Sequence, residues 1–365
     1  MALELPDFPW DSLVPYADRA RAHPDGIIDL SVGSPVDPTP DVVREALAAA
    51  TDAHAYPLTS GTPALREAIV DWFGRRRGVD DLTVANVLPT IGSKELIALL
   101  PLFLGIGKGD VVVQPAVAYP TYAIGAALVG ATVVASDDPA EWPENTKLIW
   151  VNSPGNPDGR VLDTDQLRAA VARARELGAV IASDECYAEL NWASAEPTPS
   201  ILDPRVIDGN RRSVLAVYSL SKQSNLAGYR AAFVAGCSEI IAGLLAVRKH
   251  VGLIPPLPVQ EAMIAALGDD AHVARQRELY RARRAVLAPA LEAAGYRIDE
   301  STAGLYLWAT NGDESWATVA ALAEVGILVV PSSFYGEHPA RHVRVALTAS
   351  DADIADAVAR LELLA

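Results

Sequence analysis

The sequence predicts an α/β protein in which a mostly parallel sheet is covered by helices on both faces, together with a smaller α+β domain. From about residue 60 to residue 240, short apolar or β-branched runs alternate with amphipathic helix patterns, as in parallel sheets with helical crossovers. After about residue 270 this alternation stops and a long helix is followed by several strand-like runs. A chain of 365 residues is long enough for two such domains.

The larger domain begins with a clearly bounded helix. The segment 62–78 is amphipathic, with Thr62 as a polar cap and Gly78 as a closing glycine, and a second helix is predicted over 163–177. The predicted strands are 110–115, 147–152, 179–185, 213–219 and 231–236. In sheets of this kind ligands bind beyond the carboxyl ends of the strands. The segments that follow these strands are therefore the place to look for functional residues.

The smaller domain is predicted from the C-terminal third of the chain. An Arg- and Ala-rich helix over roughly 271–294 precedes "YRIDES", "GLYLWATN", a helix, "GILVVPS", "HVRVALT" and a final helix. The N-terminal 40 residues are expected to join this domain. The expected division of the chain is 41–268 for the large domain, and 1–40 with 269–365 for the small one.

The charge balance and the few cysteine and histidine residues indicate which partners, metals and cellular compartment to expect. The 46 acidic residues exceed the 30 basic ones, which argues against a nucleic acid or an anionic membrane as a partner. Cys186 and Cys237 share no close spacing, which fits a reducing compartment and gives no zinc site. His338 and His342 straddle Pro339 and are expected to be loop residues, so no metal is predicted. With no signal peptide or membrane span recognised, a cytoplasmic protein is expected.

The segment "YSLSKQSNLAGYR", residues 218–230, gathers hydroxyl groups, an amine and a guanidinium just beyond a predicted strand. Ser219-Leu-Ser-Lys222 matches the S-x-x-K signature of serine enzymes with a lysine base, but the accompanying S-D-N and K-T-G elements do not occur. The alternative chemistry is a lysine that bonds covalently to a phosphorylated aldehyde. In that case Ser219, Ser221 and Arg230 would hold the phosphate, since an arginine fork binds two oxygens at once.

Seven motifs in register favour the second alternative. The segments 152–160 ("NSPGNPDGR"), 182–190 ("ASDECYAEL") and 219–230 resemble, in this order, the fold-type I aminotransferases, which use pyridoxal 5′-phosphate. The other four motifs are Tyr56–Arg66, 91–96 ("IGSKEL"), 118–122 ("AYPTY") and 344–348 ("RVALT"). The resemblance implies a mostly parallel seven-stranded sheet in the large domain, a smaller α+β domain, and a homodimer with shared active sites.

The resemblance implies a role for each residue around the cofactor ring. Lys222 would hold the cofactor covalently and then act as the base that moves a proton at the substrate α-carbon. Asp184 would pair with the pyridine nitrogen and keep it protonated, so that the ring can accept carbanion charge. Tyr187 and Asn156 would form hydrogen bonds with the ring's 3′ oxygen. Asn156 also suits the turn of "GNPDG".

The cofactor phosphate is expected at the start of a helix. Gly92, Ser93 and Lys94 open the segment "SKELIALLPLF", where backbone N–H groups and the helix dipole bind phosphate. The side chains that would complete the phosphate cup are Ser219, Ser221 and Arg230.

An aromatic residue is expected to stack on the pyridine ring. The resemblance assigns this role to Tyr119. The family usually has proline two residues before this aromatic, and this chain has Val117 there. Tyr122 therefore stays an alternative to Tyr119.

The substrate-binding residues come from distant parts of the chain. Arg344 would bind the substrate α-carboxylate in a two-pronged ion pair, whereas Arg341 is expected to be solvated. Gly33, in "LSVGSP", and Asn156 would lie near the same carboxylate. Tyr56 would reach the phosphate of the neighbouring subunit.

Several local strings indicate the type of aminotransferase. The segments 5–13, 29–40, 184–190 and 218–230 together resemble the actinobacterial-type N-succinyldiaminopimelate aminotransferases of lysine biosynthesis, which implies glutamate and 2-oxoglutarate as a substrate pair. The alternatives are an aminotransferase for aspartate, aromatic amino acids or LL-diaminopimelate, and a carbon–sulfur β-lyase on the same scaffold. A non-catalytic regulator would carry a DNA-binding module in front, and motifs that start near residue 30 leave no room for one.

Overall fold

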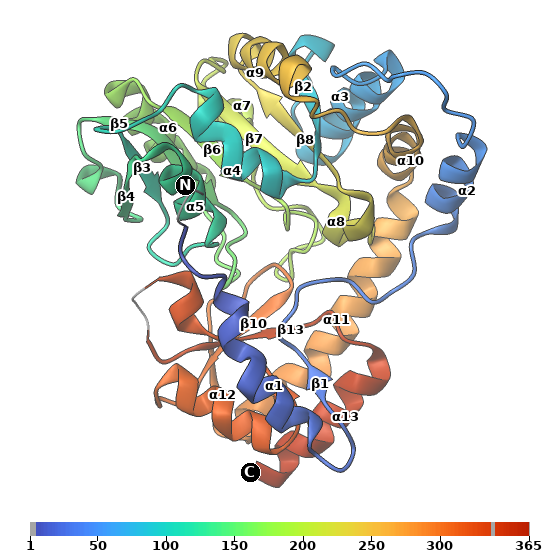
Figure 1. The fold of residues 1–365 in the computed structure, drawn as a ribbon, viewed down its shortest axis with the longest axis vertical. Helices are drawn as coiled ribbons and strands as arrows, with labels where there is room; N and C mark the ends of the chain where they lie inside the picture. Colours follow the sequence, from blue (N-terminus) through green and yellow to red (C-terminus); the bar gives the residue numbers. More distant parts are fainter. Residues whose placement is uncertain (1–4, 337–339, 365) are drawn as a thin grey trace.

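The structure is a computed structural model that describes residues 5–336 and 340–364. His338 and Pro339, and the outermost residues of the predicted small domain, lie outside the described residues. The upper part of the molecule in Figure 1 holds a seven-stranded sheet, and the lower part holds a four-stranded sheet.

The seven-stranded sheet is mostly parallel, as predicted. In spatial order the strands are β2 (Val87–Ile91), β8 (Ala231–Gly236), β7 (Val214–Ser219), β6 (Val180–Asp184), β5 (Thr146–Asn152), β3 (Val111–Gln114) and β4 (Thr132–Ala135). Strand β8 runs antiparallel to both of its neighbours, β2 and β7, and the other pairs are parallel.

Both faces of this sheet are covered, because its strands are apolar on both sides. The helices of this part are α2 (Asp41–Ala49), α3 (Pro63–Arg77), α4 (Ser93–Phe103), α5 (Thr121–Val129), α6 (Thr164–Leu177), α7 (Pro204–Ile207), α8 (Leu220–Gln223), α9 (Ser238–Val251) and α10 (Leu257–Gly268). Ile149 and Val151 of β5 pack in one apolar cluster with α3, α6 and α10, whereas Leu148 and Trp150 pack in a second with α4, α5 and α9. The predicted fold class is therefore confirmed.

The four-stranded sheet is antiparallel and has the order β12 (Val330–Pro331), β13 (Val343–Ala346), β10 (Tyr306–Thr310) and β9 (Arg297–Asp299). A separate parallel pair joins the N-terminal β1 (Ile28–Asp29) to β11 (Ile327–Leu328). Helices α1 (Val14–Arg21), α12 (Ser315–Glu324) and α13 (Asp351–Leu361) pack around these strands. The domain boundaries proposed at 40/41 and 268/269 remain a prediction.

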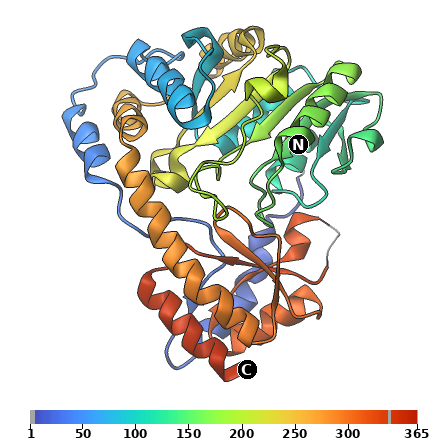
Figure 2. The ribbon, with the colours of Figure 1, turned by 180° about the vertical axis from the view of Figure 1, so that it is seen from behind.

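Helix α11 (Asp270–Ala293) runs from beside α10 in the upper part to α13 in the lower part (Figure 2). Its Arg283 forms ion pairs with Asp37, at 2.6 Å, and with Asp351, at 2.7 Å. The helix therefore ties the segment after β1 to the C-terminal helix.

Among residues 5–336 and 340–364, no helix combines the length and the apolar character needed to cross a bilayer.

Candidate active site

The predicted site residues gather where the parallel strands end. Asn152 and Asp184 are register partners at the carboxyl ends of β5 and β6, and Ser219 ends the next strand, β7. Helix α8 starts directly after Ser219 and carries Lys222 within one turn. Sheet topology thus brings the predicted lysine and aspartate to the same edge.

The Lys222 amine lies beside the N-terminal part of the chain. Its Nζ donates a hydrogen bond to the backbone carbonyl oxygen of Gly33, and the side chain is half-buried. This contact joins two residues that the sequence predicted for one site although they lie 189 positions apart.

Asp184 is a buried carboxylate that has no cationic partner among the described residues. It is 6% exposed, and its two oxygens accept hydrogen bonds from the Cys186 backbone N–H, at 3.2 Å, and from the Tyr122 hydroxyl, at 3.0 Å. In the described chain no lysine, arginine or histidine forms an ion pair with it. Burial raises the pKa of Asp184, since the charged form loses solvation. A protonated ring nitrogen would supply the missing positive charge.

The structure separates the two tyrosines considered for stacking on the cofactor. Tyr122 is fully buried: its hydroxyl is bound to Asp184 and its ring stacks on Trp150 at a centroid distance of 5.0 Å. Tyr119 is half-buried and meets Tyr122 edge-on, at 5.9 Å. Tyr122 therefore supports Asp184 from within the core, and Tyr119 keeps ring surface available to a ligand.

The residues predicted to bind the phosphate lie near the start of α4 and the end of β7. Gly92 has φ of 73°, and a Cβ atom at this position would lie 2.2 Å from Arg230 Nη2. Only glycine leaves room for the guanidinium at the helix N-terminus, where no side chain caps the helix. Ser219 Oγ donates to Ser221 Oγ at 2.8 Å. Ser93 opens α4, and the Lys94 amine instead lies over the Phe8 ring, at 5.6 Å.

Arg344 is buried in the interior of the small sheet and is not an edge residue. Strand β13 lies between β12 and β10, and Arg344 is 3% exposed. Its Nη1 donates to Asn156 Oδ1 at 3.0 Å and its Nη2 to the Ser31 carbonyl oxygen at 2.6 Å, while its Nε is buried without a partner in the described chain. None of these partners is a carboxylate, so this guanidinium fits an anionic ligand. Arg341 is exposed, as expected.

Sequence reasoning missed Tyr306. Its ring lies 4.0 Å from the Arg344 guanidinium carbon, and its hydroxyl lies 3.2 Å from the Tyr187 hydroxyl. The strand "GLYLWATN" was predicted, but nothing in it singled out Tyr306. Tyr56 is 98% exposed, so it is not brought to the other site residues within one chain, and its role at a neighbouring subunit remains a prediction.

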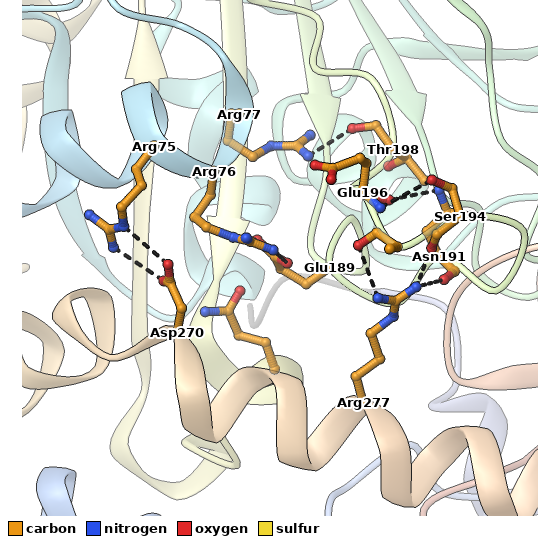
Figure 3. Close-up of polar contacts among 12 residues, drawn as sticks. Arg75, Arg76, Arg77, Glu189, Asn191, Ser194, Glu196, Thr198, Asp270 and Arg277 are labelled. Carbon is orange, nitrogen blue, oxygen red and sulfur yellow. Dashed lines mark hydrogen bonds and ion pairs between the residues drawn. The ribbon is translucent and has the colours of Figure 1, made fainter.

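Figure 3 shows how arginines hold the segment that follows Asp184. Arg77 of α3 donates to Glu185 Oε2 at 2.8 Å and to the Thr198 carbonyl oxygen at 2.7 Å. Arg76 binds Glu189 through two hydrogen bonds, at 3.1 and 2.7 Å. From α11, Arg277 donates to the carbonyl oxygens of Asn191, Ser194 and Ala195. The segment that carries Tyr187 is thus fixed from two helices.

We expect Arg77→Ala to lower the free energy of unfolding by about 3–5 kcal/mol, because it leaves Glu185 buried and unpaired. Both side chains of this ion pair are 1% exposed. Urea unfolding measures the change. The matched control is Arg44→Ala, which breaks the exposed Arg44–Asp41 pair and should leave the free energy of unfolding nearly unchanged, because solvent screens such pairs. Equal losses in the two variants would contradict a special role for the buried pair.

Comparison with known proteins identifies the family. The family model described as "Aminotransferase class I and II" matches residues 25–361. The chain belongs to this family. Class I and II aminotransferases depend on pyridoxal 5′-phosphate, which confirms the predicted cofactor and the prediction of a transaminase. The S-x-x-K match is therefore not the signature of a serine enzyme.

Individual aminotransferases resemble the chain over nearly its whole length. The 4-dedimethylamino-4-oxo-anhydrotetracycline transaminase OxyQ of Streptomyces rimosus is 55% identical over 359 residues, covering 98% of this chain and 99% of that protein. The "Probable aminotransferase Rv1178" of Mycobacterium tuberculosis is 55% identical over 362 residues, covering 99% and 86%. The solved N-succinyldiaminopimelate aminotransferase of Mycobacterium tuberculosis superposes with a TM-score of 0.87 at 28% identity, covering 98% and 97%.

The described residues fit the family's cofactor. Among them, the buried Asp184 carboxylate has no cationic partner and suits a protonated ring nitrogen. The half-buried Lys222 amine suits an aldehyde. The N-terminus of α4, which no described side chain caps, suits a phosphate. Aminotransferases of this family act on amino acids and oxo acids and typically form dimers.

Proposed function

We propose that this aminotransferase transfers an amino group from glutamate to N-succinyl-2-amino-6-oxopimelate, and thus acts as an N-succinyl-LL-diaminopimelate:2-oxoglutarate aminotransferase of lysine biosynthesis. The local strings at 5–13, 29–40, 184–190 and 218–230 support this substrate, as does the similarity to the solved Mycobacterium tuberculosis enzyme. The observation that supports an α-amino acid as substrate is the buried Arg344 guanidinium. It has no carboxylate partner in the described chain and could bind the α-carboxylate of a substrate.

Each proposed residue would act at one part of the reaction. Bound pyridoxal phosphate supplies an aldehyde that condenses with amines and a ring that accepts an electron pair. Lys222 would hold the cofactor through its amine and move a proton at the substrate α-carbon. Asp184 would keep the ring nitrogen protonated, since a buried carboxylate stabilises a nearby cation strongly. Tyr187 and Asn156 would donate to the ring oxygen.

The remaining residues would bind and orient. Gly92, Ser93 and Lys94 would offer backbone N–H groups to the phosphate, and Tyr119 would cover one face of the ring. The side chains proposed to complete phosphate binding are Ser219, Ser221 and Arg230.

Substrate binding would involve both parts of the chain. Arg344 would clamp the α-carboxylate with two parallel hydrogen bonds, beside Gly33 and Asn156. We further propose a cytoplasmic homodimer in which Tyr56 reaches the phosphate of the partner subunit. Its almost complete exposure in one chain agrees with a partner that covers it.

A second candidate substrate comes from the similarity to OxyQ. At 55% identity over 98% of this chain, a shared acceptor of the 4-oxo-anhydrotetracycline type is the strongest rival to an oxopimelate. Such an acceptor presents a ring ketone, whereas the oxopimelate is an open-chain 2-oxo acid, so the two candidates can be separated directly.

The test is an absorbance spectrum of the holoenzyme before and after addition of N-succinyl-LL-diaminopimelate without an oxo acid. The proposal expects the visible cofactor band to shift to shorter wavelength and to return with 2-oxoglutarate. A band that shifts with glutamate but ignores the succinylated substrate would exclude the proposed substrate. Subsequent return of that band with the 4-oxo-anhydrotetracycline would establish the rival. Release of pyruvate and ammonia from cystathionine would instead identify a β-lyase activity.

A further inference from the structure

Tyr306 contacts three residues predicted for the site, Gly33, Tyr187 and Arg344. None of the roles proposed above involves Tyr306 itself. It lies on β10, opposite Ala346 of β13, and is 3% exposed. A Cβ atom on Gly33 would lie 1.9 Å from the Tyr306 hydroxyl oxygen. The hydroxyl therefore rests against the Gly33 backbone, whose carbonyl oxygen accepts the hydrogen bond from Lys222.

The ring of Tyr306 supports Arg344. The guanidinium carbon lies 4.0 Å from the ring centroid, closer than the 5.3 Å to the second ring, that of Tyr335. A guanidinium over an aromatic face is attracted by the ring quadrupole, and more strongly when both groups are removed from water. Because Arg344 has hydrogen-bond partners only at Asn156 and Ser31 among the described residues, this ring provides the surface on which the guanidinium lies.

The hydroxyl of Tyr306 forms a hydrogen bond with a different site residue, Tyr187. It lies 3.2 Å from the Tyr187 hydroxyl, and either oxygen can be the donor. If Tyr306 donates, the Tyr187 proton is free for another acceptor; if Tyr187 donates, that proton is engaged. Nearby Arg344 and Lys222 charges lower the pKa of Tyr306 although its burial opposes this, whereas burial raises the pKa of Tyr187.

We propose that Tyr306 is a positioning residue that holds the Arg344 guanidinium under its ring and directs the Tyr187 hydroxyl through its own. The inference rests on the roles proposed above for Arg344 and Tyr187. It does not depend on which amino acceptor the enzyme uses, because every α-amino acid donor presents the same carboxylate. Glutamate therefore serves as the test ligand.

Two substitutions separate the ring from the hydroxyl. Tyr306→Leu removes both groups, and we expect the Kd of the holoenzyme for the unreactive analogue α-methylglutamate, read from the visible band, to rise about tenfold. Tyr306→Phe keeps the ring, so this Kd should stay within about twofold, while kcat with glutamate falls about three- to tenfold. The pH dependence of the visible band should also move in Tyr306→Phe, because Tyr187 then lacks its hydroxyl partner.

The matched control is Tyr280→Phe. Tyr280 also lies beside an arginine, with Arg283 at 5.6 Å from its ring, and its buried hydroxyl has no hydrogen-bond partner in the described chain. This variant should keep the wild-type Kd, kcat and band. Wild-type Kd in a folded Tyr306→Leu variant, or an unmoved pH dependence in Tyr306→Phe, would overturn the proposal. Failure of the succinylated substrate to react, with the Tyr306 effects present for glutamate, would overturn only the proposed substrate.

Discussion

Lys222→Ala is expected to remove the visible absorbance band of the cofactor-loaded enzyme and to lower turnover by at least roughly 10²–10⁴-fold, the usual contribution of one acid–base group. The alanine side chain can neither hold the cofactor through an amine nor carry a proton at the α-carbon. The Gly33 carbonyl oxygen also loses its hydrogen-bond donor. Spectra and single-turnover rates measure the two effects separately.

The control for this variant is Lys249→Ala. Lys249 lies exposed on α9 and is not among the residues predicted for the site, so its removal should change neither the band nor the rate. Circular dichroism should show that both variants are folded. An unchanged visible band in Lys222→Ala would remove this lysine from the mechanism.

We expect Asp184→Ala to lower turnover by about two to four decades while the chain still folds. Losing one partner of a buried ion pair costs about 3–5 kcal/mol, and each ~1.4 kcal/mol is tenfold in rate. Asp184→Asn should behave alike, because the amide nearly preserves the shape and removes the charge. Steady-state kinetics with saturating cofactor measure both variants.

Stability of the cofactor-free protein distinguishes a catalytic role of Asp184 from a structural one. Burial raises the pKa of this carboxyl, so its charged form is disfavoured in the folded protein above its ordinary pKa. Replacement by asparagine should therefore leave the melting temperature of the cofactor-free protein at neutral pH unchanged or higher. A lower melting temperature together with near-wild-type turnover would assign Asp184 to the core instead of the reaction.

Most of the large sheet could be predicted because its strands are short apolar runs between clear helix patterns. The five predicted strands agree with β3, β5, β6, β7 and β8 to within one residue at each end. The sequence did not reveal β2 and β4, which form the two edges of the sheet. Pro89 interrupts the strand pattern of β2, and proline in a strand is tolerated at an edge.

The candidate site could be predicted where its residues follow strands, and not where it depends on contacts between distant segments. Asp184 and Lys222 stand next to recognisable strands. Tyr306 touches Gly33 only because β10 and the N-terminal segment meet in space, and no local pattern encodes that approach. The support of Asp184 by Tyr122 likewise joins residues 62 positions apart.

The contacts of α11 limit which insertions and deletions this enzyme can tolerate. Arg277 binds the segment after Asp184, and Arg283, six positions later and about 9 Å further along the axis, binds Asp37. One extra residue between them would turn every later side chain by about 100° around the helix. Closely related enzymes should therefore vary in length at surface loops, while the spacing between these two arginines stays constant.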